Sequence, residues 1–341
     1  MGSRPGLLVF VWCGALLLCA SAMQAQDGTR SGGDSSTNSH LKKVPSGEIL
    51  VKGAWASASD TTRPLPEGGR VASGTYTNAY FGLSYALPAG WTPKYAGPPP
   101  SDSGYYVLAQ VMPPLARDGS LPGTILVTAQ DLFFTEAPAE NTLELVDYNR
   151  EMLSKDYKVE RGPEAVTVAG RTFIRFDYGA PAADLHWHVL ATEIRCHVLK
   201  FVFMSRDLKL TDALIRQLGI LQLPAEAGAA AGQGGGSAPV CVKDYAEGEN
   251  VIERTDPYFG ERRYNAVPVR IIIDKDGNVT HVHFLSAFPD QAKAIQDSVM
   301  QWKFKPYIRD GKAVEVETGI MFGHAPRTVA PAASKGAPVN N

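Results

Sequence analysis

Basic clusters are missing from this 341-residue chain, in which 33 Lys and Arg residues are balanced by 35 Asp and Glu residues. The formal net charge is -2, and no run of Lys or Arg exceeds two residues. A protein that binds nucleic acid needs a basic patch or stripe to meet the phosphates. The composition therefore argues against nucleic acid as the partner.

Motifs that carry catalytic chemistry are also missing. Neither Cys196 nor Cys241 lies in a Cys-x-x-Cys motif, and the chain has no Gly-x-Ser-x-Gly elbow and no P-loop. Its acidic residues are scattered and form no recognisable catalytic pair. We therefore expect a protein that is not an enzyme and that uses no cofactor.

Cysteine is scarce, with four residues in the whole chain. Two of them lie in the apolar N-terminal stretch, which leaves Cys196 and Cys241 for the mature protein. A pair of cysteines in an oxidising compartment can form a disulfide. Because the two residues lie in different predicted domains, we favour two separate thiols and keep the disulfide as the alternative.

The N-terminus has the pattern of a secretory signal peptide. Arg4 precedes an apolar stretch over residues 7–18, and Ala20-Ser21-Ala22 fits a small-x-small cleavage site. We expect a signal peptide over residues 1–22, cleaved near Ala22, and a periplasmic or secreted protein. The alternative is an uncleaved anchor in the inner membrane, although about 17 apolar residues is short for the ~20 that span a bilayer.

Composition divides the rest of the chain. Residues 23–73 are polar and predict a disordered spacer, residues 225–238 are a Gly/Ala linker, and residues 324–341 predict a disordered tail. Two domains remain, at 74–224 and 239–323. The flexible linker predicts that they move independently.

The first domain is predicted to be α+β, with a mostly antiparallel sheet and helices. A helix begins at Asn141, which forms a capping-box-like pair with Glu144, and a second begins near Thr211. Its predicted strands span residues 81–87, 105–112, 124–132, 165–168, 172–178, 185–191 and 197–204.

The C-terminal domain is predicted to run strand, strand, helix, strand. Asp276-Gly277 separates two apolar runs, 267–273 and 279–285, and this is a strong hairpin signal. Pro289 opens a helix, and Asp310-Gly311 forms a turn before a last strand up to Phe322.

This C-terminal pattern resembles the C-terminal domain of the TonB family over residues 240–323. The resemblance is carried by Asp274-x-Asp276-Gly277-x-Val279, by the following Leu285-Ser286-Ala287, and by Trp302-Lys303-Phe304-Lys305-Pro306. It implies a small sheet with one packed helix. It also implies a periplasmic role, in which the domain captures an extended peptide of an outer-membrane transporter along a sheet edge.

By the same resemblance, the last strand is the docking edge. We therefore expect the partner-binding residues Val314, Glu315, Val316, Glu317 and Thr318. Strand addition needs free backbone donors and acceptors and little else from the sequence. The alternative is that the two glutamates protect this edge from unwanted pairing. Trp302 and Phe304 are expected in the core.

The first domain resembles PsbP-like domains over about residues 75–223. The resemblance is carried by Tyr80-Phe81-Gly82-Leu83-Ser84-Tyr85-x-Leu87-Pro88-x-Gly90-Trp91 and by the late strand at 197–203. It implies a binding or assembly module and no particular chemistry.

Two histidine pairs offer a metal site as a further alternative. His186 and His188, like His281 and His283, share one face of a predicted strand. A closed site needs more ligands, so we favour polar residues that face solvent and expect no metal.

The leading hypothesis is an exported envelope protein that binds a protein or peptide partner by strand addition. The alternative is a TonB-type energy transducer for outer-membrane transport, anchored by an uncleaved N-terminal helix.

Overall fold

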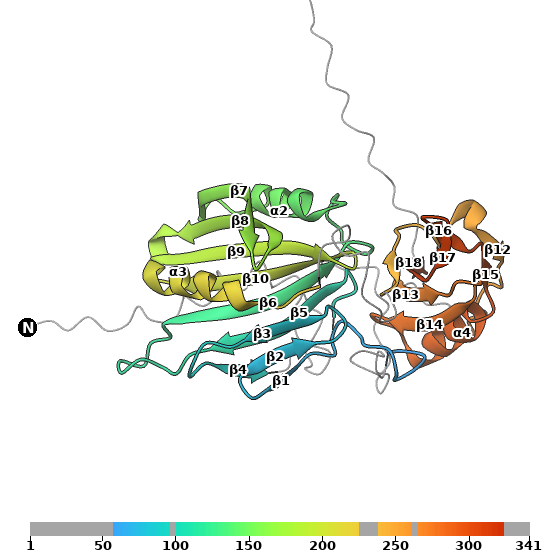
Figure 1. Ribbon diagram of the computed structural model, residues 1–341, viewed down its shortest axis with the longest axis horizontal. Helices are drawn as coiled ribbons and strands as arrows, with labels where there is room; N and C mark the ends of the chain where they lie inside the picture. Colours follow the sequence, from blue (N-terminus) through green and yellow to red (C-terminus); the bar gives the residue numbers. More distant parts are fainter. Residues whose placement is uncertain (1–56, 96–99, 225–237, 261–264, 324–341) are drawn as a thin grey trace, which may run out of the picture.

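The computed structural model describes residues 57–95, 100–224, 238–260 and 265–323, which form two packed bodies (Figure 1). The predicted signal peptide, residues 23–56 of the predicted spacer, almost all of the linker and the C-terminal tail lie outside the described residues. The two-domain α+β architecture is confirmed.

A seven-stranded antiparallel sheet forms the first domain, in the order β4-β5-β6-β10-β9-β8-β7. Its strands are β4 (Thr92–Tyr95), β5 (Tyr105–Met112), β6 (Gly123–Asp131), β7 (Lys158–Val168), β8 (Arg171–Ala180), β9 (Leu185–Ile194) and β10 (His197–Ser205). The strands predicted for this sheet are confirmed, except that β7 begins well before residue 165, and β4 was not predicted. Central β10 pairs with both β6 and β9, so it joins the two halves of the sheet.

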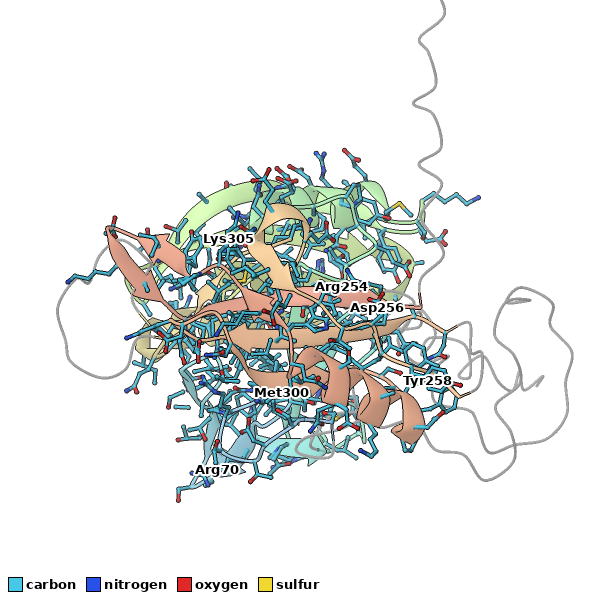
Figure 2. The ribbon with its side chains drawn as sticks, turned by 90° about the vertical axis from the view of Figure 1, so that its right-hand side faces the viewer. Arg70, Arg254, Asp256, Tyr258, Met300 and Lys305 are labelled. Atoms are coloured by element: carbon cyan, nitrogen blue, oxygen red, sulfur yellow. A yellow bond between two sulfur atoms is a disulfide. The ribbon has the colours of Figure 1, made fainter. Side chains whose placement is uncertain are left out.

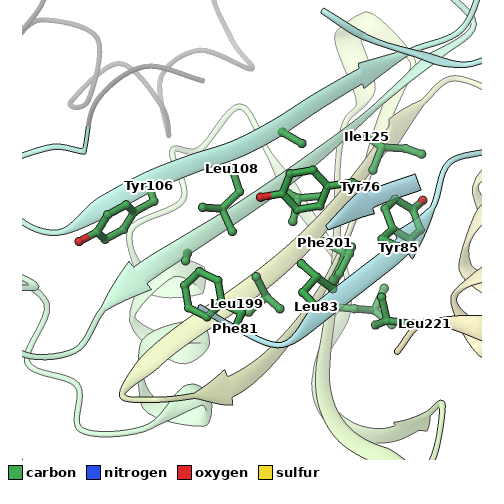
Figure 3. Close-up of a cluster of buried hydrophobic side chains, with 14 of the residues drawn as sticks. Tyr76, Phe81, Leu83, Tyr85, Tyr106, Leu108, Ile125, Leu199, Phe201 and Leu221 are labelled. Carbon is green, nitrogen blue, oxygen red and sulfur yellow. The ribbon is translucent and has the colours of Figure 1, made fainter. Parts of the chain in front are cut away.

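One face of this sheet is covered by a second, three-stranded sheet and by a helix. The small sheet contains β1 (Arg70–Ala72), β2 (Thr75–Asn78) and β3 (Leu83–Ala86), and the helix is α3 (Leu208–Gln217). Apolar side chains at alternate strand positions meet between the layers (Figure 3). The core on this face includes Tyr76, Leu83, Tyr85, Tyr106, Leu108, Ile125, Leu199, Phe201 and Leu221.

The opposite face of the large sheet packs against α2 (Thr142–Glu151). Leu145 and Val146 of α2 are buried in a separate cluster with Phe176 and Trp187. The predicted cap is confirmed, because the side chain of Asn141 accepts a hydrogen bond from the backbone N–H of Glu144.

The C-terminal domain has a four-stranded sheet in the order β11-β18-β13-β14, with α4 (Pro289–Val299) across one face. Its strands are β11 (Val240–Cys241), β13 (Val267–Ile273), β14 (Val279–Phe284) and β18 (Val316–Phe322). Two short pairs complete the domain, β12 (Val251–Glu253) with β15 (Lys303–Phe304) and β16 (Tyr307–Arg309) with β17 (Lys312–Val314). The predicted order of strand, strand, helix, strand is confirmed for β13, β14, α4 and β18.

The turn between β13 and β14 has the predicted chemistry. Gly277 has a φ of 83°, and a Cβ atom there would collide with the carbonyl of Phe304. The carboxylate of Asp274 accepts the backbone N–H groups of Asp276 and Asn278. Trp302 and Phe304 are buried, as expected.

Two expectations about domain organisation are wrong. Residues 57–73 belong to the fold: residues 57–67, which we call the strap, pack along β14, and β1 follows them (Figure 1). The two domains do not move independently either, because a disulfide and buried ion pairs join them. The first error arose because the strap is polar in composition, although its apolar residue Leu65 is buried and only 1% exposed.

Candidate strand-addition edge and domain interface

The residues predicted to bind a partner lie on and beside β18. Val314 ends β17, where it pairs with Tyr307, and Glu315 forms an ion pair with Arg63 of the strap at 3.0 Å. Val316 and Glu317 open β18, and Thr318 is fully buried. The structure therefore places Val316, Glu317 and Thr318 in β18 with buried side chains, whereas Val314 and Glu315 precede this strand and are half-buried.

The outer edge of β18 is already paired over its first residues. β11 runs parallel to β18, with Val240 opposite Val316 and Cys241 opposite Glu317. The N–H of Val240 donates to the carbonyl of Glu315 at 2.7 Å, and that of Val242 donates to the carbonyl of Glu317 at 3.0 Å. A segment from outside the β13–β18 unit thus takes the backbone groups that strand addition would use.

Beyond Glu317, this edge has no partner strand among the described residues. The carbonyls of Glu315 and Glu317 point toward β11, so the backbone groups of Gly319 and Met321 point to the same side by the period of two. Met321 is 38% exposed. The second half of β18 therefore offers backbone groups for an added strand.

The opposite edge of the sheet is covered by the strap. Ala58 pairs antiparallel with His283 of β14, the N–H of Ser59 donates to the carbonyl of Val282, and that of Phe284 donates to the carbonyl of Ser57. Both edges of the small sheet are therefore paired with segments from elsewhere in the same chain, β11 on one side and the strap, through a single bridge, on the other.

The face of the sheet opposite α4 is charged, and it packs against the first domain. Arg270 of β13 lies on this face, and its guanidinium is 2.6 Å from the carboxylate of Asp131 in β6 and 3.1 Å from that of Glu317. The guanidinium also lies over the ring of Phe133, 4.4 Å from its centre. Arg270 and Asp131 are almost fully buried, so this contact is part of a dry interface.

Glu317 makes further contacts across this interface. Its carboxylate accepts a hydrogen bond from the hydroxyl of Tyr80 and pairs with Arg195 at 2.6 Å. Burial alone would raise the pKa of the Glu317 carboxyl, but Arg270 and Arg195 outweigh it and hold that pKa well below its usual range. Buried Glu317 therefore does not act as an exposed charge that protects the edge. Glu317 joins the domains instead.

His197 lies beside this network at the start of β10. Its Nδ1–H donates to the carbonyl of Arg195 at 2.8 Å, and its Nε2 faces Asp131 at 3.5 Å. Burial and the neighbouring charge of Arg270 lower the pKa of His197 to about 4. The imidazole is therefore neutral near pH 7.

The histidines of β14 do not face solvent, so that expectation is wrong. His281 bonds Asp60 of the strap at 2.6 Å, and His283 bonds Glu67 at 3.0 Å. Both imidazoles are buried, with side chains 4% and 2% exposed. The strap covers this second face of β14 and pairs its histidines with carboxylates. The alternation of polar and apolar residues did not predict this cover.

The histidines of β9 are also paired within the protein. His186 bonds Glu160 at 2.7 Å, and buried His188 lies 3.1 Å from Asp177. Across the parts of the chain that the structure describes, no group of three or more His, Cys, Asp or Glu side chains is placed to hold a metal.

Cys196 and Cys241 form a disulfide, so the preference for two thiols is wrong. Cys196 lies at the tip of the β9–β10 hairpin, and Cys241 lies in β11. Their Cα atoms are 6.0 Å apart. The expectation failed because it treated the domains as separate, whereas β11 reaches across to the first domain.

The far end of the C-terminal domain exposes a few large side chains. Figure 2 views this end, where Tyr258 is 87% exposed and Met300, just after α4, is 42% exposed. Arg254 lies over the ring of Trp302 at 4.8 Å.

Within the described residues, no helix is both long and apolar enough to cross a bilayer.

Sequence reasoning missed Arg270, Asp131 and Arg195 as interface residues. A signal for Arg270 was present, because a single arginine interrupts an otherwise apolar strand. A charge in such a strand points to a buried ion pair. Nothing local in the sequence identified its partners, which lie 139 and 47 residues away along the chain.

A search of curated proteins gives no match. Among solved structures, the chain is similar to the solution structure of cyanobacterial PsbP (CyanoP) from Synechocystis sp. PCC 6803, with 15% identity, a TM-score of 0.32, and coverage of 46% of this chain and 96% of that one. Residues 261–323 match the family described as Gram-negative bacterial TonB protein C-terminal, and the C-terminal domain of this protein is therefore TonB-like.

Proposed function

We propose that the protein is an exported, non-enzymatic binding protein of the cell envelope, whose TonB-like domain recognises an extended segment of a protein partner by strand addition on β18. The match of residues 261–323 to the TonB C-terminal family supports the envelope location and a protein partner. An outer-membrane transporter is one candidate for that partner.

The observation that carries this proposal is the outer edge of β18. Its first part already holds an added strand, β11, in a parallel register. Its second part, from Gly319 to Phe322, has outward backbone groups and no strand beside it in the described residues. An edge that accepts one short strand in cis has the geometry to accept another chain.

The predicted residues keep a role in this proposal. A partner strand either continues from the end of β11 along Gly319 and Met321, or displaces β11 and pairs along Glu315, Val316 and Glu317. In both cases the backbone of β18 supplies the hydrogen bonds. The buried side chain of Glu317 holds the strand in place through Arg270.

Photocrosslinking in cells of the native host tests the proposal. A photoreactive phenylalanine at position 321 is expected to join one extended segment of an envelope protein. The same group at Val159, an exposed residue of β7, serves as the control. Adducts that map to many unrelated segments, or that form equally from both positions, would rule out strand addition at this edge.

The energy transducer remains a second candidate because the matching family is named for the TonB protein. It requires that residues 1–22 stay attached as an anchor. The intact mass of protein recovered from the envelope separates the two: a start near Met23 supports the exported binding protein, and retention of residues 1–22 supports the transducer. The docked position of the TonB-like domain on the first domain favours the binding protein.

A further inference from the structure

β11 occupies the site that the proposed function assigns to a partner. It contributes two residues to the sheet, and it is bonded to β18 through Val240 and Val242. The same carbonyls, those of Glu315 and Glu317, would bond a partner strand. β11 is therefore an intramolecular competitor for the edge.

Besides the disulfide, only two backbone bonds from Val240 and Val242 and the packing of the Val242 side chain hold β11, while the chain just after it is anchored separately by buried Tyr245. The residues of β11 are only half-buried, and a strand this short is a marginal attachment. The disulfide ties Cys241 to Cys196, which lies in a tight turn with Arg195, both at a φ of 52°. That turn connects β9 and β10 in the middle of the large sheet, so the bond anchors β11 to a rigid body.

We propose that the outer edge of β18 is a strand-exchange site that the Cys196–Cys241 disulfide closes. We call this control of the edge by the disulfide the gate. In the oxidised protein β11 fills the first part of the edge, beside Val316 and Glu317. After reduction β11 leaves, and an extended segment of a protein partner, parallel to β18, takes its place. This inference rests on the proposed function, and it adds when the edge is open and in which direction the partner runs.

The reduction needs a dithiol, such as the active site of a thiol oxidoreductase. One thiolate of the dithiol attacks a sulfur of the disulfide, which forms a mixed disulfide and releases the other cysteine as a thiolate. The second thiolate of the reductant then displaces the first cysteine. Two electrons pass to Cys196 and Cys241, each of which takes up a proton, and the reductant becomes a disulfide. Both cysteines are partly exposed, so a reductant can reach them.

The surroundings of β11 describe the segment that would replace it. Val242 packs against the core of the TonB-like domain together with Ile320. A replacing strand therefore carries an apolar, preferably β-branched residue at this position. It extends further than β11, because β18 continues to Phe322 while the chain after Val242 turns away at Asp244, which has a φ of 61°.

A peptide derived from this chain tests the gate. The probe is a fluorescent peptide, Ala-Pro-Val-Ser-Val-Thr-Val-Thr, which carries residues 238–242 with serine in place of Cys241, followed by three β-forming residues that would pair along Gly319 to Met321 and so outcompete the shorter tethered β11. Fluorescence anisotropy compares its binding to the full chain when oxidised, when reduced with dithiothreitol, and as the Cys196→Ser/Cys241→Ser variant. Binding at least tenfold tighter to the two forms without the disulfide is expected. A peptide with the same residues in scrambled order is the control.

Amide hydrogen exchange on the same samples separates the possible failures. The inference predicts that the N–H of Glu317 loses protection on reduction, while Ile271 of β13 and His283 of β14, which pairs with Arg270, keep theirs. Loss of protection in all three would mean that the disulfide holds the domain folded, and the gate would be wrong.

Two other outcomes would also reject the gate, and they bear differently on the proposed function. Equal peptide binding to the oxidised chain would leave the proposed function standing with an edge that is always open. A Glu317 amide that stays protected after reduction, with no binding, would show that β11 remains in place. If the Glu317 amide is released and no peptide binds, the edge does not accept strands, and the proposed function fails with the gate.

Discussion

The guanidinium of Arg270 in the TonB-like domain lies 2.6 Å from the carboxylate of Asp131 in the first domain, and their side chains are 1% and 0% exposed. Glu317 binds the same guanidinium from β18. The second face of the small sheet is therefore an interface within the chain. A partner is left with the edges of that sheet, of which the second half of β18 is the part without a neighbouring strand among the described residues.

Replacement of Arg270 by methionine tests this interface. The change leaves Asp131 without its closest cation and Glu317 with Arg195 alone, in a buried site. Removing one partner of a buried pair destabilises a protein by about 3–5 kcal/mol. Urea denaturation measures the loss. The matched control is Arg63→Met, because the Arg63–Glu315 pair is 30% and 26% exposed, and about 0–1 kcal/mol is expected there. Similar losses in both variants would contradict a buried interface.

Removal of the disulfide is expected to lower stability through the entropy of the unfolded chain. The two cysteines are 45 residues apart, and a closed loop of this length is worth about 4 kcal/mol in the chain-entropy description. The denaturation midpoint of the wild-type protein should therefore fall in reductant, and that of Cys196→Ser/Cys241→Ser should not change. A wild-type midpoint that is insensitive to reductant would show that the bond does not form in solution.

The strap should contribute to folding although its sequence is polar. Leu65 is 1% exposed, and truncation of a buried leucine to alanine destabilises a protein by about 2–5 kcal/mol. Leu115 is 66% exposed, so Leu115→Ala is the matched control and should stay within about 0.5 kcal/mol. Thermal or urea unfolding of both variants gives the comparison. If Leu65→Ala behaves like the control, the strap is not packed on the fold.

Acid should weaken the protein partly through His197. Its pKa falls from 6.5 to about 4 in the fold, so between these values the unfolded chain binds more protons than the folded one. The contribution of His197 is then complete above pH 6.5 and is lost as the pH falls toward 4, by roughly 3 kcal/mol in all. Urea midpoints from pH 7 to pH 4 measure the slope, and His197→Gln should flatten it. An unchanged slope in that variant would assign the acid sensitivity to other groups.

Local sequence signals predicted the elements of the TonB-like domain well. The turn at Asp274 to Asn278 depends on Gly277 and on a nearby carboxylate, and Pro289 begins α4 as its position indicated. His281 and His283 share one face of β14, as the alternation predicted, and the structure places Val282 and Phe284 of the other face in the core with α4. Such features depend on residues a few positions apart, which a sequence displays directly.

The sequence did not predict how distant segments meet. His281 and His283 alternate with apolar residues, which is typical of a strand with one wet face, but Asp60 and Glu67 cover them from more than 200 residues away. The sequence likewise assigned Cys241 and Cys196 to separate domains, because it does not show that β11 pairs with β18 next to the first domain. Contacts of this kind form only when distant segments and domains dock, and composition and periodicity do not predict that docking.

Amide hydrogen exchange on β18 tests the central relationship most directly. The account predicts that, in the oxidised full-length protein, the N–H of Glu317 is strongly protected by β11 while that of Met321, which points to the same side beyond β11, exchanges quickly. Once the disulfide is reduced, a strand-forming partner should protect both Glu317 and Met321. Equal protection of Glu317 and Met321 in the protein alone would contradict an edge that is closed at one end and open at the other.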